Sequence, residues 1–434
     1  MQKILNYQIL DQIYGSDRTI VYRAYAELYK KLVILKLPNH PYPSFQELTQ
    51  YRNAYALMKK LKFPGLVKIL ALEKFEQRLM LVMEDFGGMS FHEYLCNQNI
   101  SEHSNLFTIN QFFQIALQII NPLEKLHENQ IIHKDIKPYN IIINPQTKQI
   151  QLIDFSTTTK LPKETPEIRN PNTLEGILAY ISPEQTGRMN RGIDYRSDFY
   201  SLGITFYELL TRQLPFTSED PIELVHFHIA RQPKPLIELN PEIPEILNSM
   251  VLKLIEKMPE ARYQTVAGLR YDLDKCYDEW EKNQTITVFN LGETDYRKYL
   301  IIPETLYGRE QEIETLLTSF DRISNREKSQ SELMLVSGLS GIGKSALVNE
   351  IHKPIVEKRG YFIEGKFDQF QREIPFLAWL HAFQQLIKQI LSEPEVKLQN
   401  IITELQEKLG EEVQAIIDVI PENAGNEELE EKIF

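Results

Sequence analysis

The sequence predicts an α+β domain of two lobes, followed by the first portion of a separate α/β domain. Short runs of β-branched and aromatic residues dominate the first 85 residues, whereas apolar residues at helical spacing dominate from there to about residue 275. Near residue 333, another apolar run leads into a glycine-rich turn and a new helical pattern. A sheet lobe and a helical lobe therefore precede a new domain.

The elements of the sheet lobe lie between turn residues. Gly15 interrupts the first apolar runs, and Pro64 with Gly65 ends a helical pattern. The expected elements are strands at residues 7–13, 20–25, 32–37 and 79–83 and a helix at residues 45–62.

One helix of the second lobe has a clear apolar face. Its apolar residues recur at alternating steps of four and three, which is typical of an amphipathic helix. The residues are Phe112, Ala116, Ile119, Leu123 and Leu126.

The pattern weakens after the second lobe, and this predicts a linker punctuated by Asn283, Gly292 and Pro303. A strand at residues 333–337 opens the next domain. The acidic end of the chain favours a solvated tail. The expected limits are 1–275 for the first domain (lobes 1–85 and 86–275), 276–304 for the linker and 305–434 for the portion of the second domain.

The composition excludes several classes of protein. Hydrophobic residues make up 42% of the 434, enough for a sizeable core. A formal net charge of −12 argues against a broad surface for nucleic acid or anionic membranes. Cys96 and Cys276 form no CxxC pair, so neither disulfides nor structural zinc are expected. The N-terminus lacks a signal peptide and no segment has the length of a membrane span, which favours a cytoplasmic protein.

The most informative segment is IIHKDIKPYNIIIN at residues 131–144. Asp135 follows His133 by two positions and precedes Asn140 by five. This pattern resembles the catalytic loop H-R-D-x-x-x-x-N of eukaryotic-like protein kinases. The resemblance implies that Asp135 accepts the proton of a substrate hydroxyl and that Asn140 gives an oxygen to magnesium. Lys137 lies two residues after Asp135, an arrangement typical of serine/threonine kinases. The resemblance implies that its cation neutralises charge on the transferred phosphate.

Two further motifs extend the resemblance on either side of this loop. The segment IDFS at residues 153–156 matches D-F-G with serine for glycine, which implies that Asp154 holds magnesium. Lys36 ends the apolar run at residues 33–36, as the lysine of V-A-I-K does. The resemblance therefore implies that Lys36 contacts the α- and β-phosphates of ATP.

Weaker matches complete the expected nucleotide site. Residues 81–85 match the hinge, whose backbone binds adenine. By the same resemblance, the residues expected to contact the nucleotide here and in the first strands are Glu84, Phe86, Gly15 and Val21.

The helical lobe contains matches of a structural kind. Residues 182–184 stand for the A-P-E motif, and Arg262 lies where the family places the partner of Glu184. Residues 198–203 match the helix that supports the catalytic loop.

The resemblance covers residues 1 to about 275 and implies a bilobed protein-kinase fold. Residues 179–191 are similar to large bacterial hybrid sensor kinases, known especially from cyanobacteria, in which a kinase domain precedes an AAA-like signalling ATPase. This similarity implies ATP and Mg2+ as cofactors and a protein serine or threonine as substrate. Downstream two-component signalling proteins are implied as further partners, and nucleic acid is not.

Three features depart from the family pattern. The glycine positions of the phosphate loop hold Tyr14, Ser16 and Thr19. Ala54 lies where the helix after Lys36 carries a glutamate, and Glu47, two turns earlier, is the candidate substitute. Ile177 replaces a threonine that bonds the catalytic aspartate. These departures leave two readings open: a protein serine/threonine kinase, or a weakened pseudokinase that acts as a signalling scaffold. Five threonines are candidates for phosphorylation that orders the activation loop: Thr157, Thr158, Thr159, Thr165 and Thr173.

A second nucleotide site is expected in the α/β portion. Residues 338–345 satisfy G-x-x-x-x-G-K-[ST] between an apolar run and a helical pattern, which is typical of a P-loop NTPase. Lys344 would reach the β- and γ-phosphates and Ser345 would bind magnesium, with backbone N–H groups supplied by Gly338, Gly341 and Gly343. Asp418 is the one candidate for the acidic strand end that hydrolysis needs, and no second acid accompanies it. We therefore expect one of two outcomes: nucleotide binding without turnover, or an α/β portion that does not fold fully.

Overall fold

The computed structural model divides the chain into two units, one of residues 1–164, 194–215 and 234–298 and one of residues 165–193, 216–233 and 299–434. The residues that it describes are 3–98, 108–160, 178–189, 191–296, 306, 308–324, 331–339, 341–351, 354–355, 358, 360–365, 367, 376–391 and 395–409.

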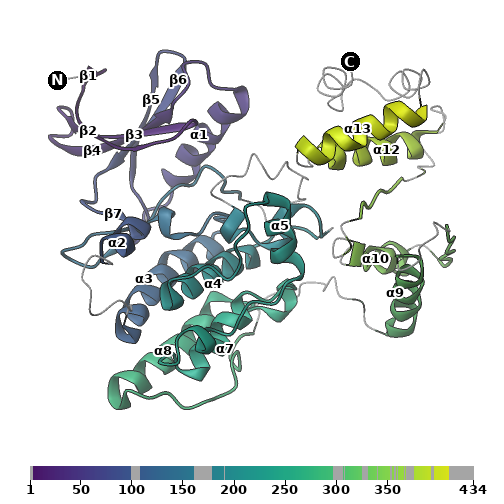
Figure 1. Ribbon diagram of the computed structural model, residues 1–434. Helices are drawn as coiled ribbons and strands as arrows, with labels where there is room; N and C mark the ends of the chain where they lie inside the picture. The colour runs from purple at the N-terminus through teal and green to yellow at the C-terminus, as the bar shows by residue number, and fades with distance from the viewer. Residues whose placement is uncertain are drawn as a thin grey trace. The chain divides into compact units, whose positions relative to one another are not determined.

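The first unit begins with a six-stranded antiparallel sheet in the order β1-β2-β3-β4-β6-β5 (Figure 1). The four predicted strands are confirmed as β2, β3, β4 and β6. The sequence reading missed β5, which pairs with β6 through a register shift. The strands are β1 Lys3–Ile4, β2 Tyr7–Gly15, β3 Thr19–Ala26, β4 Lys31–Pro38, β5 Ile69–Phe75 and β6 Arg78–Glu84.

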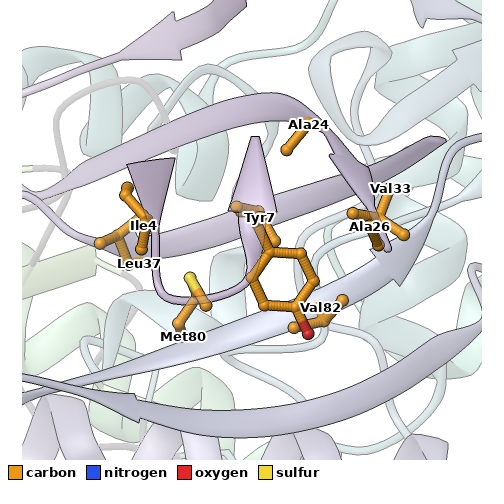
Figure 2. Close-up of a cluster of buried hydrophobic side chains, with 9 residues drawn as sticks. Ile4, Tyr7, Ala24, Ala26, Val33, Leu37, Met80 and Val82 are labelled. Atoms are coloured by element: carbon orange, nitrogen blue, oxygen red, sulfur yellow. The ribbon is translucent and has the colours of Figure 1, made fainter. Parts of the chain in front are cut away.

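Alternate residues of the strands build the core of this lobe (Figure 2). Because strand side chains alternate between faces, residues two apart such as Ala24 and Ala26, or Met80 and Val82, reach the same core. Burying each larger apolar side chain contributes about 1.5–3 kcal/mol. Tyr7 closes the cluster, and its hydroxyl donates to Glu73 Oε1 at 2.5 Å.

Helix α1 (Phe45–Met58) packs against β5 and β6. The predicted helix is confirmed but ends at Met58, four residues earlier than expected. Ser44 caps its first turn in a reciprocal capping box with Glu47. Tyr51, Ala54 and Met58 form its buried stripe.

The helical lobe follows a small sheet in the order β7-β8-β9. In it α3 packs against α8 and α4 packs against α7, and all five residues of the predicted apolar face are buried in α3. The elements are β7 Met89–Ser90, α2 Phe91–Gln98, α3 Ile109–Glu128, η1 Pro138–Asn140, β8 Ile141–Ile143, β9 Ile150–Leu152, α4 Arg196–Thr211, α6 Leu236–Leu239, α7 Glu245–Leu254, η5 Pro259–Ala261 and α8 Val266–Asn283 (Figure 1).

Residues 284–296, which lie in the expected linker, are bound to the start of α8. Asp295 accepts hydrogen bonds from Gln264 N and from Thr265 Oγ1, each at 2.6 Å. A side chain at Gly268 would collide with Asp295, because a Cβ there would lie 2.6 Å from the Cβ of Asp295. Helix α8 itself extends past residue 276, to Asn283.

The regular elements that the structure describes in the second unit are helices. The predicted strand at residues 333–337 is wrong, since the described stretch 331–339 is not a strand. A strand needs a neighbouring strand to pair with its backbone N–H and C=O groups. Among the described residues, no strand pairs with residues 333–337. The helices are η3 Leu178–Tyr180, η4 Pro183–Thr186, α5 Pro221–Ala230, α9 Glu310–Ser324, α10 Lys344–Asn349, α12 Leu377–Leu391 and α13 Glu395–Leu409. Each helix of the described ranges is too short or too polar to cross a membrane.

The contact between α4 and α7 is tight at Gly203. A Cβ there would lie 2.7 Å from Leu254 Cβ and 2.6 Å from Ile255 Cγ2. Overpacking costs about 1–3 kcal/mol and exceeds the ~1 kcal/mol that alanine gains in helix propensity. We expect Gly203→Ala to lower the free energy of unfolding by about 1–2 kcal/mol, measured by urea denaturation. Gln114→Ala, on the exposed side of α3, is the control and should change it by less than about 0.5 kcal/mol.

Candidate active site

The loop that carries Asp135 is fixed to α4 by a buried carboxylate. Asp198 Oδ1 accepts from Lys134 N at 2.7 Å, and Asp198 Oδ2 accepts from His133 N at 3.0 Å. His127 Nε2 lies 2.8 Å from the same Oδ2. Lys134 has a φ of 67°, a left-handed conformation that costs a non-glycine residue of order 1–3 kcal/mol. The two bonds to consecutive N–H groups hold this conformation in place.

His133 links the loop to the segment that carries Asp154. Its Nε2 donates to Ile153 O at 3.1 Å, and its ring meets Phe155 edge-on at 4.9 Å between centroids. The imidazole is fully buried. It is therefore a packing and hydrogen-bonding residue.

Asp135, Lys137 and Asn140 form one cluster. Lys137 Nζ lies 2.9 Å from Asp135 Oδ1. Asn140 Nδ2 donates to Asp135 Oδ2 at 2.7 Å and to Asp135 O at 2.9 Å. The short helix η1 makes these bonds possible. Asn140 N donates to Lys137 O, and this turn of the backbone brings the side-chain amide of Asn140 next to Asp135. Both side-chain bonds use the amide nitrogen, so the amide oxygen of Asn140 is the atom suited to a cation.

Lys36 and Asp154 form the second cluster, with Lys36 Nζ 2.6 Å from Asp154 Oδ1. Ser156 Oγ donates to the same oxygen at 2.7 Å, a role for this serine that the sequence reading missed. Burial alone would raise the pKa of Asp154, but the Lys36 ammonium and the bonds from Ser156 outweigh it and hold that pKa well below its usual range. Asp154 is therefore a carboxylate at neutral pH.

A backbone bond joins the two clusters, because Ile153 N donates to Asn140 O at 2.9 Å. Lys36 reaches this place from β4, where it pairs with Val21 on β3 and with Leu81 on β6. The structure thus brings together both acids, Asn140 and the two lysines. Two carboxylates and an amide oxygen suit Mg2+, which takes its other oxygens from water or phosphate. Among the described residues, no three His, Cys, Asp or Glu side chains gather as a self-sufficient metal cage.

Glu47 does not replace the missing helix carboxylate. Its Oε2 accepts from Ser44 N at 2.8 Å and from Ser44 Oγ at 2.9 Å, in the capping box of α1. Ala54 is buried, with 3% of its surface exposed. The suggestion that Glu47 pairs with Lys36 is therefore wrong, and the cause is local competition from the helix cap.

The remaining residues that are expected to contact a nucleotide lie on the first strands and in the hinge segment. Gly15 pairs with Ile20 at the end of the β2–β3 hairpin. The Glu84 carboxylate pairs with Lys31 and Lys68, and its pKa is lowered chiefly by the hydrogen bond from Lys31. The Glu84 side chain is thus engaged, and its backbone N–H donates to Lys68 O at 2.9 Å.

At the other end of the hinge, Phe86 O accepts from Asn144 Nδ2 at 3.3 Å. Adenine contacts at Glu84 and Phe86 stay predictions.

The expected activation-loop threonines are only partly described. The hydroxyls of Thr157 and Thr158 both donate to His133 O, at 3.2 and 3.5 Å, and Thr159 pairs with Ile132 through its backbone. Thr165, Thr173 and Ile177 lie outside the described residues, as do Asp418 and residues 421–434. The predicted pair of Glu184 and Arg262 stays a prediction.

The glycine-rich loop of the second unit has two left-handed residues, Gly341 with a φ of 81° and Gly343 with a φ of 92°. These conformations favour glycine. Lys344 Nζ donates to Gly338 O at 2.9 Å and to Leu339 O at 2.8 Å, so the lysine folds over the loop. Ser345 is exposed in the first turn of α10, and the predicted helix after the loop is confirmed.

Comparison with known proteins identifies both parts of the chain. Residues 12–272 match the protein kinase domain model, and residues 305–432 match the AAA ATPase domain model. The chain therefore belongs to the protein kinase family. The predicted family, fold class and domain order are confirmed.

Three relatives illustrate the match. The chain is 31% identical over 281 residues to serine/threonine-protein kinase PrkC of Bacillus subtilis, covering 64% of this chain and 41% of PrkC. It is 29% identical over 255 residues to a probable serine/threonine-protein kinase PknB of Lactococcus lactis, covering 59% and 38%. It is 33% identical over 401 residues to hybrid signal transduction histidine kinase G of Dictyostelium discoideum, covering 72% and 12%. The chain spans less than half the length of each of these relatives.

The bonds to Asp198 make it a sensitive position. In Asp198→Asn an amide NH2 replaces one accepting oxygen and faces a backbone N–H. We expect the free energy of unfolding to fall by about 1–3 kcal/mol, the cost of a buried donor without an acceptor, measured by chemical denaturation with circular dichroism. Asp278→Asn, exposed on α8, is the matched control. Equal stability of the two variants would contradict the role assigned to Asp198.

Proposed function

We propose that the chain transfers the γ-phosphate of Mg-ATP to serine or threonine hydroxyls of protein substrates. The observation that carries the proposal is the convergence of two bonded clusters, Asp135–Lys137–Asn140 and Lys36–Asp154, joined through the backbone. Family membership and the named serine/threonine kinases among the relatives support it.

In this proposal Asp135 orients the substrate hydroxyl and accepts its proton as the oxygen attacks the γ-phosphorus and the bond to the β-phosphate oxygen breaks. The Lys137 ammonium, already beside Asp135, neutralises negative charge on the transferred group. Lys36 leaves its ion pair with Asp154 and binds the α- and β-phosphates. Mg2+, when bound, neutralises charge between the phosphates, and the oxygens of Asp154 and Asn140 would hold it.

The competing function is a kinase-fold scaffold without transfer. It is favoured by one observation, that Ala54 and a capped Glu47 leave α1 without a carboxylate for Lys36. Histidine kinases are named among the relatives, so two-component signalling proteins are proposed as partners in either case. We also propose the domain limits 1–275, 276–304 and 305–434.

Transfer is tested with γ-labelled ATP, Mg2+ and dephosphorylated casein. We expect Asp135→Asn to lower incorporation by about 10²–10⁴-fold, the usual contribution of a positioned general base, while Asp278→Asn retains it. A thermal shift with Mg-ATP checks that Asp135→Asn still binds nucleotide. If the unmodified chain incorporates no more label than Asp135→Asn, the scaffold function replaces the enzyme.

We propose a second nucleotide site at residues 338–345, with Lys344 and Ser345 on the phosphates and magnesium. It is supported by the match to the AAA ATPase domain and by the left-handed Gly341 and Gly343. A fluorescent ATP analogue should bind at two molecules per chain, and Lys344→Ala should reduce this to one, because its ammonium supplies the phosphate contact. A stoichiometry that Lys344→Ala leaves unchanged would contradict the second site.

A further inference from the structure

An ion pair ties the sheet lobe to the lobe connector, the segment of residues 85–88 that joins β6 to β7. Arg23 on β3 donates from Nε to Asp85 Oδ2 at 2.8 Å. The other oxygen of this carboxylate, Asp85 Oδ1, accepts from Gly87 N at 2.8 Å. Arg23 Nη1 also lies 3.7 Å from Asp11 Oδ2, but that carboxylate is 58% exposed and the contact is weak. Asp85 therefore binds a strand of the sheet with one oxygen and the backbone of the lobe connector with the other.

The lobe connector is bound on both of its sides. On the side of the sheet lobe, the Asp85 side chain is 7% exposed and that of Arg23 is 27% exposed, so their bond is largely shielded from water. On the other side, Phe86 O accepts from Asn144 Nδ2 in the loop after β8. The backbone turns at Gly87, whose φ of 69° favours glycine. The path of this segment is thus set by side chains that come from two separate sheets.

Arg23 lies on the face of the sheet that holds Lys36. Residues directly opposite each other in an antiparallel pair point to the same face, and Lys36 pairs with Val21. Because Arg23 follows Val21 by two residues, it points to that face as well, about 7 Å further along the strand. The next residue, Ala24, points to the other face, where it belongs to the buried core. The pair of Arg23 and Asp85 is therefore one row of side chains away from Lys36.

In the proposed reaction, on which this inference rests, Lys36 binds the α- and β-phosphates of ATP. The adenine ring then lies beyond the phosphates, and backbone groups of Glu84 and Phe86 are its expected contacts. Glu84 and Phe86 are the two sequence neighbours of Asp85. A bond that fixes the Asp85 carboxylate therefore also limits how far both of these backbone groups can move.

We propose that Arg23 is a positioning residue for the nucleotide: through Asp85 it holds the backbone of the lobe connector in the orientation that binds adenine. A partly exposed ion pair contributes little to the stability of a fold, whereas a preorganised site loses less free energy in ordering itself around a ligand. This gain is the same for the bound substrate and for the transition state. Loss of the pair therefore raises KM for ATP and leaves kcat unchanged.

The test is a double-mutant cycle of Arg23→Met and Asp85→Asn, made in the full chain that carries Lys344→Ala so that the second nucleotide site does not contribute. Arg309→Met is the matched control, because Arg309 Nη1 lies 2.8 Å from Glu312 Oε1 in an ion pair at the start of α9. The measurements are kcat and KM for ATP with casein, and the melting temperature without ligand. Competition with a fluorescent ATP analogue gives the Kd of Mg-ATP and of Mg-tripolyphosphate, which lacks adenosine.

We expect Arg23→Met and Asp85→Asn each to raise KM and Kd for ATP about fivefold, with kcat changed by less than about twofold. The double variant should bind ATP no more weakly than either single variant, because the two residues act through one bond. The Kd of tripolyphosphate and the melting temperature should stay near those of the parent chain, and Arg309→Met should change none of these quantities.

Three results would overturn the proposal: an unchanged KM in Arg23→Met, effects that add in the double variant, or an equal loss of affinity for tripolyphosphate. If the parent chain binds Mg-ATP but transfers no phosphate, the proposed function fails and the dissociation constants still decide. Weaker binding of ATP with unchanged binding of tripolyphosphate then supports the role of Arg23, and unchanged binding of ATP refutes it. A parent chain that does not bind Mg-ATP contradicts both proposals.

Discussion

The geometry of the site depends on one buried carboxylate, Asp198. A carboxylate with no exposed surface is costly unless donors surround it, and Asp198 meets two consecutive backbone N–H groups and His127. These bonds require the left-handed backbone at Lys134, and this turn sets the direction in which Asp135 leaves the loop. The position of Asp135, the proposed general base, is therefore fixed by the core of the helical lobe.

From that anchor, a continuous set of bonds runs to Asp154. Asn140 binds Asp135 through both its carbonyl and its carboxylate, and Ile153 N binds Asn140 O. His133 adds a parallel link to Ile153 O. Since Asp154 itself has a φ of 62°, its carboxylate is also held away from ordinary strand geometry. The helical lobe thus positions both acids, and the sheet lobe contributes Lys36 through β4.

The sequence predicted the parts of this site that follow from local spacing. The distances along the chain from His133 to Asn140, and on to Asp154, were sufficient to identify the clusters. Other features depend on how the backbone folds and on which segments lie next to each other. The hydrogen bond from Ser156 to Asp154 follows from a backbone turn that composition does not show. The strand expected at residues 333–337 does not form, and no described strand lies beside it. Glu47 was predictable in principle, because Ser44 three residues before it is the pattern of a capping box.

In the proposed reaction, the charges of the two clusters give a physical reason for a divalent cation at the site. Each lysine is paired with one carboxylate, so the pairs Lys36–Asp154 and Lys137–Asp135 each sum to zero. A triphosphate that draws the lysines to itself would leave the buried Asp135 and the partly buried Asp154 without their cations, beside further negative charge. Asp154 would hold the magnesium ion, whose charge would restore the balance there, and Asp135 would regain a proton from the substrate hydroxyl. In the proposed reaction, phosphate binding, metal binding and proton acceptance are therefore coupled through the same two ion pairs.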